Sequence, residues 1–258
     1  MSNKARIVVM GCGGSGGVPY SGNFWGKCDP KNPKNHRTRP SILIEKNDTR
    51  IVIDTGPEFR QQINAAGVIG MIDAVFYTHT HFDHVMGIDD LRAFWFKGGK
   101  KPIPAYASQE TADILLKRFD YIFSQLSEKY PPMAVMNLLQ SPTIIKDLTI
   151  HSFDQGHHDI TTTGFRIGDF AYSTDVKELP EASLKALQGV KIWVVGAYPD
   201  AEGQYNHAGL DQVNQWIARL KPEMTYLTHL NAAADYDTLC RELPPHIRPA
   251  YDGLEIII

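Results

Sequence analysis

Four potential metal ligands lie within six residues of this chain, in the run His79-Thr80-His81-Phe82-Asp83-His84. The run follows an apolar stretch over residues 74–78 that is typical of a buried strand. A strand that ends in this way holds several imidazoles and a carboxylate at the edge of a rigid sheet. Because catalytic metal sites are usually built on such rigid edges, the run predicts a fold with a sheet and a metal centre.

The length of 258 residues fits one large domain, because layered folds of strands and helices reach this size as single units. We therefore expect one domain over residues 1–258. With 43% hydrophobic and 21% charged residues, the chain has the composition of a soluble globular protein and can bury a sizeable core.

The formal net charge is −3, and no block of lysine or arginine is long enough to form a basic arm. This composition disfavours a dedicated nucleic-acid binder, which would normally carry a basic face. The three cysteines, Cys12, Cys28 and Cys240, are an odd and sparse set that fits a reducing compartment. The apolar run after Arg6 covers only residues 7–10, too short for a signal peptide or for a membrane span of about 20 residues. We expect a cytoplasmic protein that does not enter a membrane.

Short runs rich in Val and Ile, separated by turns, predict strands in both halves of the chain. They cover residues 7–10, 41–44, 51–53, 74–77, 148–153, 164–167, 170–172, 191–195, 224–227 and 254–258. Helices are predicted between them, from Ser108 to about Phe119, from Leu210 to Leu220 and from Asp235 to Leu243. Two groups of strands, each accompanied by helices, indicate a layered α/β or α+β fold.

The segment from Tyr121 to Leu139 is rich in apolar residues and contains Tyr130-Pro131-Pro132-Met133. It is compatible with two interpretations. One is a buried connector between core elements, and the other is an apolar lid or a homodimer contact near the active site. The sequence favours neither.

The run Gly11-Cys12-Gly13-Gly14-Ser15-Gly16 follows a predicted strand and matches the G-x-G-x-x-G pattern of dinucleotide sites. That pattern must open a helix, whereas Gly17-Val18-Pro19 is a poor helix start. We therefore predict no dinucleotide site. Two interpretations remain, a loop whose backbone amides approach a substrate anion and glycines that permit close backbone turns.

Imidazole and carboxylate are the expected ligands of zinc and, with more oxygen, of manganese or iron. In an extended or turning segment, His79 and His81 point the same way and can share one ion. Asp83 and His84 lie just beyond and can reach a second ion a few ångströms away. Two complete sites need more ligands, which we expect at other strand ends. The residues at such positions are His157, His158, Asp175 and His229.

The chain resembles the metallo-β-lactamase-fold hydrolases over essentially its whole length. The motifs that carry this resemblance are, in order, Asp54-Thr55-Gly56, His79–His84, a histidine near residue 157, Asp175 and His229. Three segments resemble more narrowly the branch of the phosphoribosyl 1,2-cyclic phosphodiesterase, with the tRNase Z enzymes as more distant relatives; they are Gly11–Pro19, Ser173–Asp175 and Leu227–His229. The resemblance implies an α+β fold, the αββα four-layer sandwich in which two mixed β-sheets pack face to face with helices outside.

The resemblance also implies a centre of two divalent metal ions, zinc or manganese. Its ligands would be His79, His81 and His157 for one ion and Asp83, His84 and His229 for the other, with Asp175 as the bridge. His157 is preferred to His158 because Phe153-x-Gln155-x-His157 resembles the family pattern. A glycine usually follows there, and His158 replaces it, so the choice between the two histidines stays open.

Two further residues match positions with known roles in this branch. Asp54 resembles the carboxylate that orients a ligand imidazole. His207 matches a histidine that faces the substrate phosphate. In one respect the chain departs from the phosphoribosyl enzyme, which holds a structural zinc with closely spaced cysteines in its N-terminal loop. This chain offers only Cys28 there, so we expect that zinc site to be absent and do not transfer the exact substrate.

The implied function is a phosphodiesterase that acts on a small cyclic phosphate or a nucleotide-like phosphodiester through a metal-bridged hydroxide. Asp83 would orient the hydroxide and accept a proton, and His207 would contact the phosphate or protonate the leaving group. The alternatives are a tRNA 3′-processing endonuclease, a thioester hydrolase like glyoxalase II, and a non-catalytic binding protein on the same scaffold.

Overall fold

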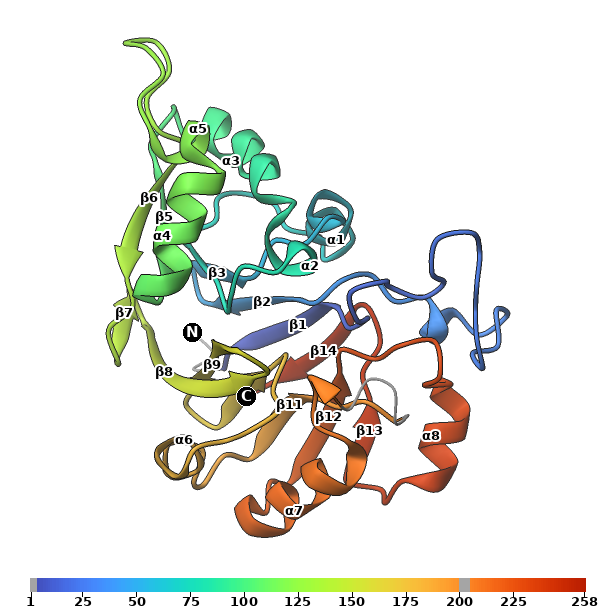
Figure 1. Ribbon diagram of the computed structural model, residues 1–258. Coiled ribbons are helices and arrows are strands. Elements are labelled where there is room, and N and C mark those ends of the chain that lie inside the picture. Colours follow the sequence, from blue (N-terminus) through green and yellow to red (C-terminus); the bar gives the residue numbers. More distant parts are fainter. Residues whose placement is uncertain (1–3, 200–204) are drawn as a thin grey trace.

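Two seven-stranded β-sheets pack face to face, and helices cover the outer face of each (Figure 1). The computed structural model describes residues 4–199 and 205–258. Both sheets are mixed, with antiparallel strands on one side and parallel strands on the other. The predicted α+β sandwich with four layers is thereby confirmed.

The first sheet has the strand order β14-β1-β2-β3-β4-β5-β6. Its strands are β1 (Arg6–Gly11), β2 (Ser41–Lys46), β3 (Thr49–Ile53), β4 (Ala74–Phe76), β5 (Ile103–Ala107), β6 (Ala134–Leu138) and β14 (Leu254–Ile257). The helices of this half are α1 (Phe59–Ala65), α2 (Phe82–Val85), α3 (Leu91–Lys97), α4 (Gln109–Arg118) and α5 (Asp120–Phe123), with 3₁₀ turns η1 (Pro33–Asn35) and η2 (Ile88–Asp90).

The second sheet has the strand order β13-β12-β11-β10-β9-β8-β7. Its strands are β7 (Thr143–Ile145), β8 (Leu148–His157), β9 (Ile160–Ile167), β10 (Phe170–Ser173), β11 (Ile192–Gly196), β12 (Met224–Thr228) and β13 (Ile247–Pro249). The helices of this half are α6 (Glu181–Ala186), α7 (Leu210–Leu220) and α8 (Tyr236–Glu242).

The alternation of side chains along each strand separates three cores. In β1, Ile7 and Val9 point between the sheets, whereas Val8 and Met10 point outward under the helices. Phe76 belongs to the core between the sheets, where its ring contacts Tyr106 and Phe165. A third core lies between β10–β12 and the helices α6–α8. Because buried strands in both sheets are apolar on both faces, the whole sandwich is a rigid frame for the loops at its edges.

The strongest helix predictions are confirmed. The helix α7 covers the predicted residues, and its apolar stripe packs on the second sheet. Ser108 and Asp235 cap α4 and α8 by accepting hydrogen bonds from backbone amides three residues on.

Four strands were not predicted, namely β5, β6, β7 and β13. Strands β7 and β13 have only three residues each, and β5 carries Pro104, so none gives the apolar run that marks a strand in sequence.

The segment from Tyr121 to Leu139 is anchored at its ends and exposed between them. Ile122 and Met133 are buried in the outer core of the first sheet, which fits the prediction of a connector. Leu126 and Tyr130 are exposed at a loop that extends beyond α5 in Figure 1. A role of this loop in a homodimer stays a prediction.

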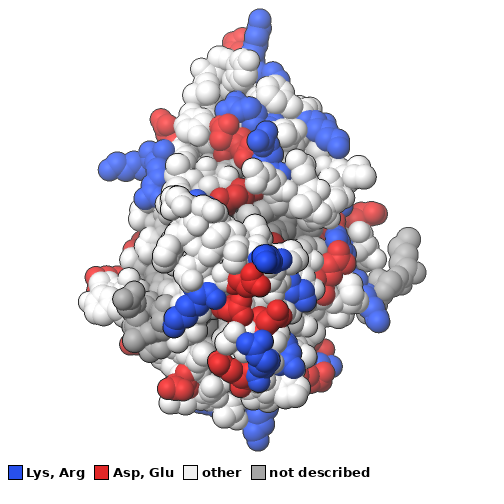
Figure 2. All heavy atoms as spheres, turned by 90° about the vertical axis from the view of Figure 1, so that its right-hand side faces the viewer, with Lys and Arg blue, Asp and Glu red and all other residues white. Residues whose placement is uncertain are grey.

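The face that carries the N-terminal loop and α8 has no single sign of charge. Figure 2 shows lysine and arginine interspersed with aspartate and glutamate over this face. Within residues 4–199 and 205–258, no helix has the length and apolarity needed to cross a bilayer.

Replacing Phe76 by alanine should destabilise the protein by about 3–5 kcal/mol, because the change opens a cavity between the two sheets. The ring is fully buried and lies 4.9 Å from Tyr106 and 5.6 Å from Phe165, measured between ring centroids. Urea denaturation in the presence of a chelator measures the effect. Phe96→Ala, at a side chain that is 51% exposed, is the control and should cost less than about 1 kcal/mol. Equal losses in the two variants would contradict the core assignment.

Candidate metal centre

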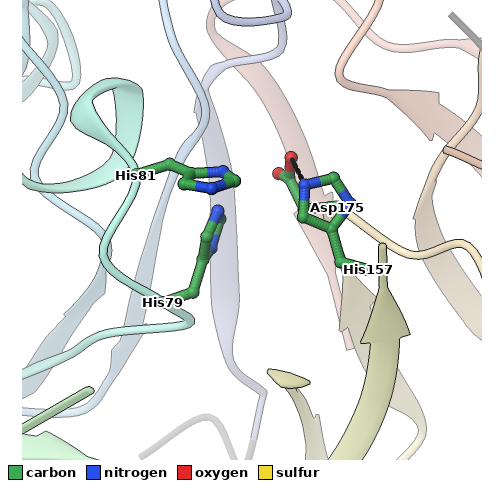
Figure 3. Close-up of side chains that lie close together, drawn as sticks. All are labelled: His79, His81, His157 and Asp175. Atoms are coloured by element: carbon green, nitrogen blue, oxygen red, sulfur yellow. Dashed lines mark ion pairs between the residues drawn. The ribbon is translucent and has the colours of Figure 1, made fainter. Parts of the chain in front are cut away.

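The ends of five strands deliver polar side chains to one edge of the sandwich. Asp54 follows β3, and the run from His79 to His84 follows β4 and leads into α2. From the second sheet, His157 ends β8, while Asp175 and His229 follow β10 and β12. Figure 3 shows side chains from the two halves pointing toward one another across the gap.

All seven residues predicted as ligands lie in this cluster. One group consists of His79, His81, His157 and Asp175, and a second consists of Asp83, His84 and His229. Within each group, one potential ligand atom per residue lies within 4.8 Å of the others. The members of the two groups are residues expected from the sequence, and a third group combines Asp175 and His229 with His207. The assignment of each residue to one ion or to a bridge stays a prediction.

The structure places His157, and not His158, in the cluster. His157 is buried and its Nδ1 donates to the carbonyl oxygen of Asn206 at 2.8 Å, which leaves Nε2 free to accept a metal. His158 is exposed, and its ring contacts Tyr205 and Asp159.

Asp175 lies at the centre of the cluster and contacts histidines from both halves. Its Oδ2 is 2.9 Å from Nε2 of His84, and its Oδ1 is 3.2 Å from Nε2 of His229. Nε2 of His157 is 3.6 Å from Oδ1. One carboxylate thus faces both groups of potential ligands.

Asp54 orients His84, as its resemblance to a family carboxylate predicts. Nδ1 of His84 donates to Oδ2 of Asp54 at 2.7 Å. The same carboxylate accepts hydrogen bonds from the backbone amide and the hydroxyl of Thr78, each at 2.8 Å. Held by three donors in a fully buried position, Asp54 fixes the imidazole so that Nε2 faces the cluster.

Opposite charges compensate one another inside the cluster. Burial by itself would raise the pKa of Asp175, but His229 and His84 outweigh it and hold this pKa well below its usual range. Burial would likewise lower the pKa of His84, but Asp175, Asp83 and Asp54 raise it well above its usual value. Without an ion, these three carboxylates therefore favour the protonated form of His84, whereas binding of a metal requires the neutral form.

A test of fit to a metal comes from the imidazole of His79. Its Nδ1 lies 2.9 Å from the hydroxyl of Thr78, while its buried Nε2 has no hydrogen-bond partner among the described residues. Burial lowers the pKa of His79 and of His157, so both imidazoles are neutral, which is the form that binds metals. Because a buried polar atom without a partner is costly, the donor set fits a cation that this nitrogen would ligate.

Three residues of the cluster have left-handed backbone conformations, with φ of 62° at Asp54, 47° at Asp175 and 56° at His229. Asp54 and His229 directly follow a strand, and Asp175 comes two residues after one. The chain turns sharply at these positions and aims each side chain at the cluster. Such conformations cost about 1–3 kcal/mol for residues other than glycine and are typical of functional sites.

His207 and the glycine run border the cluster. His207 is half-buried, and its Nδ1 lies 3.8 Å from Oδ1 of Asp175. Gly13 and Gly14 run beside the segment after His229, since the amide of Gly14 donates to the carbonyl of Leu230. The loop therefore borders the cluster, but the amides of Gly13 and Gly14 donate to the carbonyls of Thr38 and Leu230, so an approach of the loop's amides to a substrate anion stays a prediction.

Sequence reasoning missed one residue of the cluster's surroundings, Tyr198. Its ring stacks on His207, with centroids 4.3 Å apart and planes inclined by 11°. The available signal was its place just after β11, between the strands that deliver Asp175 and His229.

Replacing Asp54 by alanine should lower the affinity for zinc by about 10–100-fold, because His84 loses the acceptor that orients it. Isothermal titration calorimetry, in which zinc is added to chelator-treated protein, measures this affinity. Asp48→Ala also replaces an aspartate by alanine, but in the exposed turn between β2 and β3. This control variant should bind zinc with normal affinity. An unchanged affinity in Asp54→Ala would show that the orientation of His84 does not matter.

Comparison with known proteins agrees with this geometry. A family model described as the beta-lactamase superfamily domain matches residues 49–230. Among curated proteins, an octanoyltransferase of Porphyromonas gingivalis is 33% identical over 259 residues, which cover 98% of this chain and 51% of that protein. A ribonuclease Z of Bradyrhizobium sp. is 25% identical over 138 residues, covering 52% of this chain and 45% of that protein. The alignments thus span about half the length of these two relatives.

Among solved structures, a new diphosphatase from the PhnP family is 31% identical, with a TM-score of 0.89 over 99% of this chain and 97% of that one. The short form of human tRNase Z has a TM-score of 0.71 at 15% identity, over 97% of this chain and 98% of that one, which shows a shared fold. The family model covers well over half of the chain, and the strand-end cluster matches the ligand pattern that the sequence predicted. The protein therefore belongs to the beta-lactamase superfamily and has the metallo-β-lactamase fold.

Proposed function

We propose that the protein is a metal-dependent phosphodiesterase that hydrolyses a small phosphodiester, a cyclic phosphate or a nucleotide-like substrate. The observation that carries this proposal is the cluster of seven potential ligands with His207 beside it. Whole-length similarity to a diphosphatase adds support, because that enzyme's name also denotes cleavage of a phosphorus–oxygen bond.

Two divalent ions, zinc or manganese, would be held by the two groups of ligands on either side of Asp175. When bound, they supply Lewis-acid stabilisation of the phosphoryl oxygens and lower the pKa of water toward neutrality. The residues of the chain then position the substrate and move its protons.

Asp83 is suited to orient the attacking water. Nε2 atoms of His84 and His229 each lie 3.3 Å from its Oδ2. Although burial by itself would raise the pKa of Asp83, His84 and His229 hold it far below the usual range, so the carboxylate stays ionised. An ionised carboxylate at this position is a hydrogen-bond acceptor for water.

His207 is suited to contact a phosphoryl oxygen. Burial and the neighbouring His229 lower its pKa to about 3, so near pH 7 the imidazole is neutral. A neutral imidazole that donates its N–H can stabilise charge on a non-bridging oxygen without carrying a charge of its own.

A tRNA 3′-processing endonuclease is the second candidate, favoured by the partial match to ribonuclease Z. Two observations weigh against it. The sequence offers no long arm for gripping tRNA, and the face in Figure 2 carries no continuous basic tract. Octanoyl transfer is not proposed, because the alignment covers only half of the protein that bears that name.

A hydrolysis screen of zinc- and manganese-loaded protein tests the proposal. We expect turnover of bis(p-nitrophenyl) phosphate and of at least one substrate among cyclic nucleotides, ribose cyclic phosphates and dinucleoside diphosphates. Pre-tRNA and S-lactoylglutathione are the substrates of the two rival activities. Cleavage of either of these with none of the small phosphate esters would overturn the proposal.

Two single variants separate metal binding from catalysis. Asp175→Ala should lose bound metal, because it removes the carboxylate that contacts histidines of both groups. His207→Ala should keep its metal and lose about 10²–10³-fold in kcat, the usual cost of removing one hydrogen-bond donor from a developing charge. Metal analysis by mass spectrometry and steady-state kinetics measure the two effects.

His151→Ala, at an exposed position of β8, is the matched control and should change neither property. Full turnover by metal-loaded His207→Ala would remove His207 from the mechanism. Retention of both ions by Asp175→Ala would contradict the bridging role.

A further inference from the structure

The imidazole of His207 lacks the hydrogen bond that fixes other histidines of the cluster. His84 is held by Asp54 at 2.7 Å, and His157 is held by the carbonyl of Asn206 at 2.8 Å. For His207, no hydrogen-bond partner of the ring is found in the described ranges 4–199 and 205–258, and the 3.8 Å to Asp175 exceeds hydrogen-bond reach. The orientation of this ring must come from packing.

Aromatic rings supply that packing. Tyr198 lies 4.3 Å from His207 with an interplanar angle of 11°, while His229 lies 4.7 Å away at 29°. The centroids of His157 and His207 are also 4.7 Å apart, but the two rings are inclined by 49°. Tyr198 thus makes the nearest and most nearly parallel contact, the geometry in which stacking restrains rotation of a ring.

The backbone ties Tyr198 to the same segment. The amide of Tyr198 donates to the carbonyl of Ala208 at 2.9 Å, and Tyr198 forms a parallel bridge with Gly209. Nζ of Lys177 donates to the carbonyl of His207 at 3.4 Å. The main chain on both sides of the stacked pair is therefore fixed, and the stack fixes what remains, the torsions of the His207 side chain.

The hydroxyl of Tyr198 is placed by the glycine run. A Cβ added to Gly14 would lie 2.9 Å from that oxygen, whereas its next neighbours, Nδ1 and the carbonyl oxygen of His229, would be 3.5 Å away. Only the tyrosine oxygen would be closer than ordinary van der Waals contact permits. Gly14 does not have a positive φ, so a side chain here would conflict with the hydroxyl of Tyr198 and not with the backbone conformation.

We infer that Tyr198 is a positioning residue for His207 and that Gly14 seats it by leaving room for its hydroxyl. The inference rests on the proposed function for the role of His207 in turnover. Its structural part, the orientation of the His207 ring, is independent of which substrate the protein hydrolyses.

Tyr198→Ala and Tyr198→Phe test the stack. Alanine should lower kcat by up to about 10²-fold, the cost of misplacing a catalytic group by about 1 Å, with KM within about twofold and with full metal content. Phenylalanine keeps the stacked ring and should retain most of kcat. Tyr205→Ala is the matched control, because that tyrosine also contacts a histidine, His158, but lies outside the cluster.

Gly14→Ala and the double variant Gly14→Ala/Tyr198→Phe test the seat. The added methyl group should displace Tyr198 and lower kcat as Tyr198→Ala does. Removing the hydroxyl in the double variant restores the space, so kcat should recover to near the value of Tyr198→Phe. If kcat of the double variant is no higher than that of Gly14→Ala, Gly14 does not act by leaving room for the hydroxyl of Tyr198. A normal kcat in Tyr198→Ala would overturn the positioning role of Tyr198.

Proton NMR of zinc-loaded protein gives a readout that does not need a substrate. A ring stacked on an imidazole shields its carbon-bound protons, so Tyr198→Ala should move the resonances of His207 downfield, while Tyr198→Phe leaves them in place. His207→Ala assigns these resonances by their loss. If no phosphate ester is hydrolysed, the proposed function fails, and the spectra still decide whether Tyr198 holds His207.

Discussion

The contact between Asp175 and the histidines of both halves is the interaction on which the site depends. Asp175 follows β10 of the second sheet. The 2.9 Å contact between its Oδ2 and Nε2 of His84 joins it to the segment that follows β4 of the first sheet. A buried carboxylate is tolerated only where cationic or donor groups surround it, and His229 contributes a further contact at 3.2 Å. A bound cation would fit the same demand, because it supplies positive charge at the point where the two halves meet.

The sandwich explains why residues far apart in the chain form one site. The strands that precede His79, Asp175 and His229 end at the same edge of two packed sheets, and their apolar cores hold them there. Only the polar residues that follow them distinguish these strands from ordinary core strands. The loop of Gly14 and the segment of Tyr198 add a second set of supports, which act on His207 by shape and stacking rather than by hydrogen bonds.

The sequence predicted the parts of the molecule that leave a local signature. The run around His79 is a dense ligand pattern, and α7 has an apolar stripe that ends before Pro222. The choice between His157 and His158 could not be made locally, because only the pairing of β8 with β9 shows that the strand ends at His157 and that His158 begins the turn. Tyr198 offered only its place just after β11 as a signal, since its role arises from contacts with His207 that exist only in the folded chain.

The left-handed residues of the cluster strain the backbone and at the same time aim their side chains at the site. At Asp54, Asp175 and His229, glycine would relieve the backbone strain. It would also delete a carboxylate or an imidazole and leave its buried partners without a hydrogen bond or a compensating charge. The strained backbone therefore persists because the side chains it aims at the cluster hold one another, and a stabilised version of this protein has to be sought in its cores and loops instead.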